Sequence, residues 1–203
     1  MRWLGLVILC LFYGFYFGKM LLQRSRGIRT DQMARGEKHG KAFYTELVMK
    51  LATYLAVAAE VFSILTAKPE ISPVFTAVGA VIGLAGVALF ATAVVTMRDS
   101  WRAGIAVSER TELVTGDIFQ ISRNPAFLAF DCVYLGLLLM FFNPLLLLCS
   151  LFAAVMLHLQ ILQEESYLAD VFGDSYLAYK SCVRRYLGRK RPCSPCGGIR
   201  GTR

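Results

Sequence analysis

Two adjacent carboxylates, Glu164 and Glu165, follow a long apolar run in the sequence "LQILQEESYLADVFGDSYLAYK". Acids at the C-terminal end of an apolar helix oppose the helix dipole, which costs a few tenths to about 1 kcal/mol. Gln160 lies four residues before Glu164 and therefore shares its helix face, one turn deeper. Both carboxylates could simply be solvated, but their placement favours a site that holds a cationic ligand.

A second polar strip precedes the previous apolar run, in "ISRNPAFLAFD". Pro125 suits the first turn of a helix, because its missing N–H is no loss there. Arg123 and Asn124 then stand beside free backbone donors that suit an anionic group. The alternative is that Arg123 is only a positive anchor at the membrane surface. A basic and amide strip facing two carboxylates would suit a zwitterion with an added positive charge.

The composition predicts an integral membrane protein with one domain. The chain has 203 residues, of which 56% are hydrophobic and 18% charged, and its mean hydropathy is +0.53. A soluble domain of this size needs more polar surface. The net charge of +8 could suggest nucleic acid. The basic residues flank the apolar runs, however, which is a membrane-topology pattern, so we expect no nucleic-acid partner.

Five apolar runs are candidates for crossing the bilayer, which takes about 20 residues each. Asn143 and Pro144 form a turn between the last two runs, because proline disfavours helix at the preceding residue. We therefore predict an all-α polytopic membrane protein with about five transmembrane helices, the last two a tight helical hairpin, plus cytosolic amphipathic helices on either side of a break at Gly173. The five runs are Trp3–Leu22, Leu47–Ala67, Pro73–Met97, Ala126–Phe142 and Pro144–Leu162.

Basic residues predict the topology. They gather in residues 19–41, 98–123 and 180–203, whereas the opposite side has only Arg2 and Lys68. Because basic residues mark the cytoplasmic side, we expect the N-terminus outside and the C-terminus in the cytoplasm. Residues 1–187 should form the single membrane domain, and residues 188–203 a basic flexible tail.

Other polar groups have less specific patterns. Glu60, Asp131 and His158 lie inside apolar runs, where an ionisable residue is a functional candidate by default, although each could be a packed structural group. Cys193 and Cys196 form a C-x-x-C without the second pair that a zinc site needs, so we expect no metal.

Glycines recur on the third apolar run, in "VGAVIGLAGVAL". Gly79, Gly83 and Gly86 have the small-residue spacing that lets helices approach closely. This spacing predicts close packing within the protein, or a possible homo-oligomer through the third helix.

Three landmarks together resemble a known family: "ELVTGDIFQISRNPAFLAF", the Asn143-Pro144 turn and "EESYLADVFGDSYLAYKSCVRRYL". They resemble the isoprenylcysteine carboxyl methyltransferase family and its bacterial relatives, over roughly Ser100 to Leu187. Members of that family bind S-adenosylmethionine at the cytosolic face of the last hairpin and methylate substrates that enter from the lipid. The resemblance implies a membrane methyltransferase, of a bacterial inner membrane, whose cofactor-binding part is about residues 100–187. Its partners would be membrane lipids and a lipophilic substrate with a carboxylate, thiol or amine.

The resemblance also implies residue roles. Glu164 corresponds to the glutamate that binds the cofactor, with Glu165 beside it. Gln160 stands where the family has an arginine that orients the substrate carboxylate, and Arg102 is a candidate to replace that arginine. These two are the catalytic candidates. The other implied cofactor-binding residues are Leu113, Val114, Thr115, Phe119, Arg123, Asn124, Pro125, Ala126 and Phe127.

The chain departs from the family pattern at several of these positions. Asn124 replaces a histidine, and Phe119 and Phe127 lack the hydroxyls of the family's tyrosines. Gln160 cannot clamp a carboxylate with a charge, as arginine does. The departures at Phe119 and Phe127 bear on two hydrogen bonds to the cofactor, and the departure at Gln160 bears on a prenylcysteine carboxylate as the substrate.

Two rival functions remain. Sterol reductases share a related hairpin but bind NADPH, a polyanion that adjacent Glu164 and Glu165 would repel. S-adenosylmethionine carries a sulfonium and an ammonium, which the two carboxylates attract. The electrostatics therefore favour the methyl donor over an NADPH-dependent reductase. The other rival is a non-catalytic membrane scaffold with the same fold.

Overall fold

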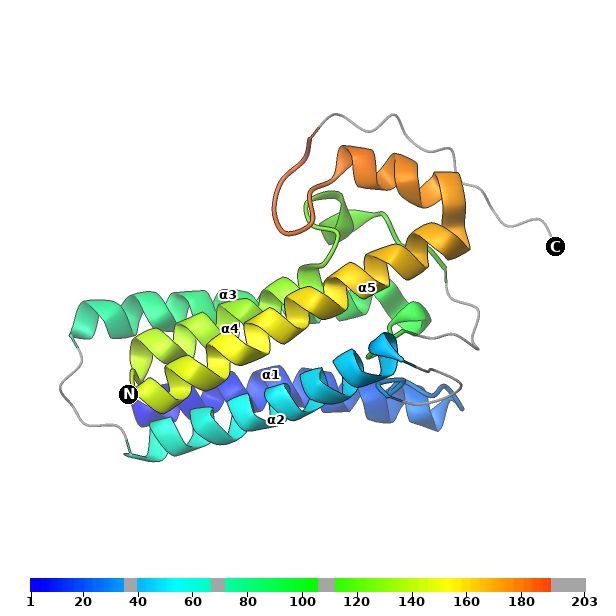
Figure 1. The fold of residues 1–203 in the computed structure, drawn as a ribbon. Helices are drawn as coiled ribbons and strands as arrows, with labels where there is room; N and C mark the ends of the chain where they lie inside the picture. Colours follow the sequence, from blue (N-terminus) through cyan, green and yellow to red (C-terminus); the bar gives the residue numbers. More distant parts are fainter. Residues whose placement is uncertain (35–39, 67–71, 106–111, 191–203) are drawn as a thin grey trace.

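A computed structural model of the chain describes residues 1–34, 40–66, 72–105 and 112–190 (Figure 1). These residues form helices and no extended strand, which confirms the all-α prediction. Cys193 and Cys196, with most of the predicted tail, lie outside the described residues. The helices are α1 (Arg2–Ser25), α2 (Lys41–Thr66), α3 (Pro73–Met97), η1 (Arg98–Ser100), η2 (Asp117–Gln120), α4 (Pro125–Met140) and α5 (Pro144–Cys182).

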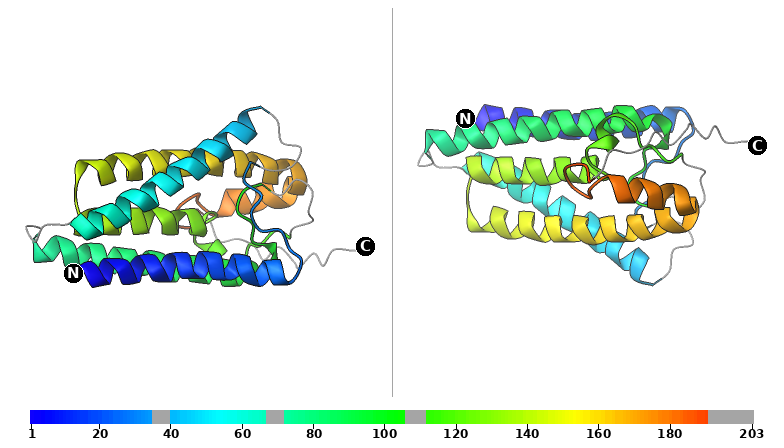
Figure 2. Two further views of the ribbon diagram at one scale, coloured as in Figure 1. Left: turned by 90° about the horizontal axis from the view of Figure 1, so that it is seen from below. Right: turned by 90° about the horizontal axis from the view of Figure 1, so that it is seen from above.

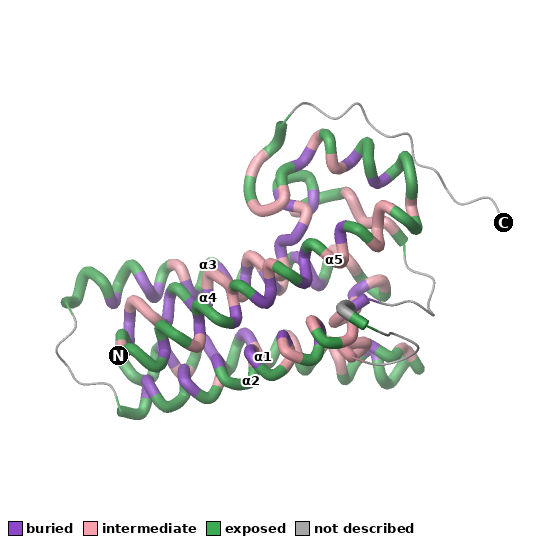
Figure 3. The backbone as a smooth tube through the Cα atoms, in the orientation of Figure 1, coloured by how far each residue is buried: buried purple, intermediate pink, exposed green. Residues whose placement is uncertain are grey.

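The predicted polytopic membrane fold is confirmed. Within the described ranges, α1, α2, α3 and α5 are long and apolar enough to cross a bilayer, and α4 is a shorter apolar helix of 16 residues. Their outward faces carry exposed apolar side chains such as Leu51, Val81 and Leu148, whereas buried residues line the inside of the bundle (Figure 3). Apolar surface on this scale suits contact with lipid.

Successive helices run up and down the bundle, so polar segments collect at one end (Figures 1 and 2). We call this the polar end: residues 26–34, 98–105 and 112–124, and the chain from 163 to 190. The N-terminus lies at the opposite end (Figure 1). The assignment of the polar end to the cytoplasm stays a prediction.

The glycines of α3 allow it to pack closely against α4. A Cβ atom on Gly79 would lie 2.5 Å from the carbonyl oxygen of Gly136, and one on Gly86 would lie 2.9 Å from that of Ala129. Gly83 instead faces Ile8 of α1. The close packing predicted for these glycines therefore occurs within the chain, and association of copies through α3 stays a prediction.

The turn between α4 and α5 has the tight form that Asn143 and Pro144 predicted. The Asn143 side chain caps α5 by accepting a hydrogen bond from the Leu146 N–H at 2.9 Å, and it donates to the Ser63 hydroxyl of α2 at 2.6 Å. Beyond the turn, α4 packs mainly on α3, and α5 packs mainly on α2. The two arms of the hairpin thus join the two halves of the bundle.

The last part of α5 folds back at Gly173, as the sequence predicted. Gly173 has φ 51° and ψ −129°, which a residue with a side chain rarely adopts. The reversed segment packs on the loop before α4 (orange in Figure 1). There, the Tyr179 hydroxyl donates to the carbonyl oxygen of Phe119 at 2.6 Å, and Tyr176 is buried beside it. This contact joins the C-terminal segment to the cavity wall described below.

Candidate active site

One cavity of about 560 Å³ reaches from the polar end into the apolar interior of the bundle. Its polar-end wall includes Arg102, Arg123, Asn124 and Glu164. Its inner wall is apolar and aromatic and comes from α1, α2, α3 and α4, with Leu9, Tyr13, Val57, Phe90 and Phe130 among the lining residues. A charged compartment and an apolar compartment are therefore continuous.

Most of the residues that the resemblance singled out line this cavity. Thr115, Gln160 and Glu165 do not. Those that do are Arg102, Leu113, Val114, Phe119, Arg123, Asn124, Pro125, Ala126, Phe127 and Glu164. The structure brings these residues together from a loop, the start of α4 and the middle of α5, and their roles in binding stay predictions.

Glu164 reaches the cavity, and Gln160 supports it from behind. Gln160 is fully buried and donates from Nε2 to Glu164 Oε1 at 3.1 Å. Arg123 and Asn124 line the same cavity. The acidic group and the basic and amide strip therefore face one space, as a zwitterionic ligand would require.

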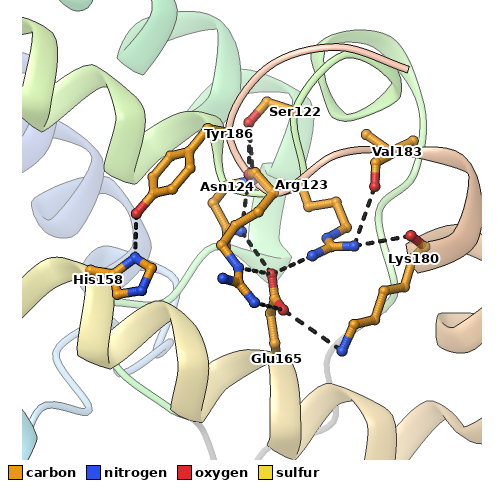
Figure 4. A network of polar contacts seen from close by, with 9 residues as sticks. Ser122, Arg123, Asn124, His158, Glu165, Lys180, Val183 and Tyr186 are labelled. Carbon is orange, nitrogen blue, oxygen red and sulfur yellow. Dashed lines mark hydrogen bonds and ion pairs between the residues drawn. The ribbon is translucent and has the colours of Figure 1, made fainter. Parts of the chain in front are cut away.

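Glu165 lies in a different environment, although it is the next residue (Figure 4). Its side chain is 5% exposed. Arg123 Nη2 lies 2.6 Å from Glu165 Oε1, and Arg185 donates to both carboxylate oxygens at 2.9 and 3.0 Å. Asn124 Nδ2 donates to Oε1 at 3.4 Å, and Lys180 Nζ lies 3.8 Å from Oε2. We call these five residues the Glu165 network.

The network keeps Glu165 ionised. Burial raises the pKa of its carboxyl, but the hydrogen bonds from Arg185 and Arg123 outweigh burial and lower the pKa from the ordinary 4.5 to about 2. Glu165 lies past Leu162, where the apolar part of α5 ends. The paired carboxylate joins the segment after α5 to the loop before α4.

Arg123 is held on several sides. Its Nη1 donates to the carbonyl oxygens of Lys180 and Val183 at 3.0 and 3.2 Å (Figure 4). Its backbone N–H donates to the carbonyl oxygen of Arg184 at 3.1 Å. Its Nε is buried and has no hydrogen-bond partner among the described residues. Arg123 is thus fixed in position by Glu165 and by the end of α5.

Sequence reasoning missed Arg185, Asp31 and Lys50. Arg185 lies in a basic segment that indicates only topology, and its spacing from Glu165 gives no signal that the two residues pair. Lys50 Nζ and Asp31 Oδ2 are 2.9 Å apart, and both residues line the cavity. Asp31 belongs to a segment that pairs with residues 101–103, so the link between α1 and α2 lies against the loop after α3.

The three ionisable residues inside the apolar runs do not line the cavity. Glu60 is fully buried, and its carboxylate oxygens have no hydrogen-bond partner in the described part of the chain; the same holds for Asp131 Oδ1. His158 Nδ1 lies 2.5 Å from the Tyr186 hydroxyl, which links α5 to the C-terminal segment (Figure 4). A functional role for His158 stays a prediction.

The fold and the cavity define a helical membrane protein whose cavity has a polar part and an apolar part. Comparison with known families is consistent with this class: residues 74–175 match the phospholipid methyltransferase family. The comparison with curated proteins gave no match. The family match covers half of the chain, so the chain belongs to this family of membrane methyltransferases. Because the family is of the isoprenylcysteine carboxyl methyltransferase type, the resemblance is confirmed.

Proposed function

We propose that the protein transfers a methyl group from S-adenosylmethionine to the amine headgroup of a membrane lipid. One observation carries this proposal: a single cavity joins Glu164, Arg123 and Asn124 to an apolar space inside the bundle. A cofactor with charged groups fits the first part of the cavity, and a lipid tail fits the second.

The polar part of the cavity suits S-adenosylmethionine. Glu164 would attract its sulfonium and ammonium groups. Arg123 and Asn124, which line the same cavity, would face its carboxylate. Leu113 and Val114 offer apolar contact to the adenosine part. An NADPH-dependent reductase is not favoured, since Glu164 would repel its phosphates and the family is one of methyltransferases.

The apolar part of the cavity suits a lipid tail. Phe17 of α1 and Tyr54 of α2 line the cavity and are also 50% and 59% exposed. The cavity wall therefore reaches the lipid-facing surface between these two helices. A substrate dissolved in the bilayer could enter there without leaving the membrane.

An amine is the acceptor that the polar groups favour. Gln160 replaces the arginine that would hold a substrate carboxylate, and the carboxylates of Asp31 and Glu112 also line the cavity. Lys50 and Arg102 line it too and would meet the phosphate of a phospholipid. The family's description as phospholipid methyltransferases points the same way.

The reaction needs positioning more than acid–base power. The neutral amine forms a bond to the methyl carbon while the bond from that carbon to sulfur breaks, so the donor leaves as an uncharged thioether. The proton of the amine passes to a cavity carboxylate or to water. Holding the two reactants in line can supply up to about 7–11 kcal/mol of the barrier reduction.

The test is methyl transfer from S-adenosylmethionine with a labelled methyl group to a membrane lipid extract, with the product identified by mass spectrometry. We expect an N-methylated phospholipid from the purified protein and, at a cofactor concentration near the wild-type Kd, much less of it from the Glu164→Gln variant. If the label is found in an ester or a thioether, the nucleophile is a carboxylate or a thiol, and the proposal of an amine acceptor is wrong. No transfer by folded protein would overturn the methyltransferase proposal and favour a scaffold.

A further inference from the structure

A fully buried carboxylate of α2 lies behind the proposed cofactor site. Glu46 is 0% exposed, and α2 precedes the residues 74–175 that match the family. Its Oε2 accepts a hydrogen bond from the Ala34 N–H at 2.8 Å, and its Oε1 accepts one from the Ile105 N–H at 3.0 Å. One side chain thus joins the segment after α1 to the segment after α3.

Glu46 also contacts the support of Glu164. Gln160 Nε2 lies 3.5 Å from Glu46 Oε1 and 3.1 Å from Glu164 Oε1. The amide nitrogen therefore stands between two carboxylates, one on α2 and one on the cavity wall. These contacts form a continuous chain from Glu46 through Gln160 to Glu164.

The two carboxylates determine how the Gln160 amide is oriented. The amide has two N–H donors on one side and an acceptor oxygen on the other. Turning it over would place Oε1 between two carboxylates and remove both contacts. Gln160 Oε1 is buried and has no hydrogen-bond partner among the described residues, so no opposing contact favours the reversed orientation.

We propose that Glu46 is a positioning residue of the cofactor site, which sets Gln160 so that Gln160 holds Glu164 in the rotamer that faces the cavity. This inference rests on the proposed function, in which Glu164 receives the cationic groups of the cofactor. Without the amide contact, Glu164 would have one restraint fewer, so ordering its side chain when the cofactor binds would cost more free energy. The cost falls on cofactor binding, and methyl transfer in the bound complex keeps its rate.

Glu46 also stabilises the backbone at Ala34, so a substitution of Glu46 would disturb that segment. Ala34 has φ 52°, a conformation that is uncommon for a residue with a side chain, and its N–H donates the hydrogen bond that Glu46 Oε2 accepts. Substitution of Glu46 is therefore expected to lower stability as well as affinity. The test has to separate the two effects.

A double-mutant cycle separates them. Glu46→Gln, Gln160→Met and the double variant are made in the full chain, with calorimetric Kd for S-adenosylmethionine, kcat at saturating cofactor and Tm measured for each. Gln160→Met keeps a similar volume but cannot donate. Asp99→Asn is the matched acid-to-amide control, since Asp99 pairs with Arg26 at the polar end and both side chains are about half exposed (53% and 54%).

We expect each single variant to raise the cofactor Kd about fivefold to tenfold, and Glu46→Gln to keep kcat at saturating cofactor within about twofold. In the Gln160→Met background, Glu46→Gln should raise Kd by less than about twofold further, because the path to Glu164 is already broken. Glu46→Gln should still lower Tm in the Gln160→Met background. The Asp99→Asn control should leave Kd, kcat and Tm unchanged.

Several outcomes would overturn the inference. If the two substitutions multiply in Kd, or if Kd stays unchanged while Tm falls, Glu46 has only a structural role. If Glu46→Gln does not fold, an unchanged Kd in Gln160→Met alone refutes the chain of contacts. A folded wild-type protein that does not bind S-adenosylmethionine would instead overturn the proposed function.

Discussion

Glu164 and Glu165 are adjacent on α5 but lie in two different regions of the molecule. Glu164 lines a cavity with Arg123 and Asn124, whereas Glu165 is 5% exposed and bonded by Arg123 and Arg185. Successive residues of a helix point about 100° apart, so one can face a cavity while the next faces packed chain. The comparison shows that a pair of like charges need not form one site.

The largest effect should come from breaking the Glu165 network. Glu165→Gln leaves the buried Arg123 guanidinium, 5% exposed, without its counter-charge. We expect the free energy of unfolding to fall by about 3–5 kcal/mol, as when one partner of a buried ion pair is removed. Denaturant unfolding in detergent measures this, with Asp99→Asn as the control for an exposed ion pair. If Glu165→Gln unfolds with the same curve as the wild-type protein, the Glu165 network does not stabilise the fold.

Acidification should remove part of the same stabilisation. The folded pKa of Glu165 is about 2 and its ordinary value is 4.5, so its contribution is complete above about pH 4.5. It is lost as the pH falls from there towards about 2. Thermal unfolding between pH 6 and pH 3 should show a falling Tm whose slope is smaller in Glu165→Gln. Equal slopes in the two proteins would contradict the assignment.

Removing the charge of Glu164 should change binding instead of stability. We expect Glu164→Gln to raise the Kd for S-adenosylmethionine about tenfold to hundredfold, which is about 1.4–2.8 kcal/mol. The amide keeps the shape of the side chain, so Tm should change little. Calorimetric titration of wild type and variant decides this. A large loss of Tm with unchanged Kd would assign Glu164 to the structural region with Glu165.

The smallest effect should come from narrowing the apolar part of the cavity. Val57→Trp places a large side chain in the wall formed by α2, and we expect the KM for the lipid acceptor to rise severalfold with an unchanged cofactor Kd. Leu55→Trp is the matched control, because Leu55 is 45% exposed and is not among the cavity-lining residues. If Val57→Trp and Leu55→Trp have the same KM for the lipid acceptor, the acceptor does not bind in the apolar part of the cavity.

Much of the fold could be predicted from the sequence, because its signals are local. Apolar length predicted the five helices, the Asn143-Pro144 turn predicted the hairpin, and Gly173 predicted the break in α5. The sequence also suggested a basic and amide strip facing the carboxylates, and Arg123 and Glu164 do line one cavity. α2 begins before its apolar run, and α5 continues well beyond Leu162 to Cys182, because polar residues can continue a helix beyond the bilayer. The role of these residues in binding stays a prediction.

The pairings within the polar end could not be predicted. Glu46 and Gln160 are 114 residues apart in the chain, and Arg123 and Glu165 are 42 apart. Neither separation follows a helix period or a motif. Sequence reasoning gave Glu165 to the cofactor, whereas the structure places it in a network of protein side chains and outside the cavity lining.

The sequence by itself determined that this chain forms apolar helices of membrane length, where they break, and which family of methyltransferases it belongs to. Only the tertiary structure decided which carboxylate faces the cavity, which is neutralised by arginines, and which one of α2 contacts Gln160. Helix formation depends on neighbouring residues, whereas burial and hydrogen-bond partners depend on segments that meet only after the helices have packed.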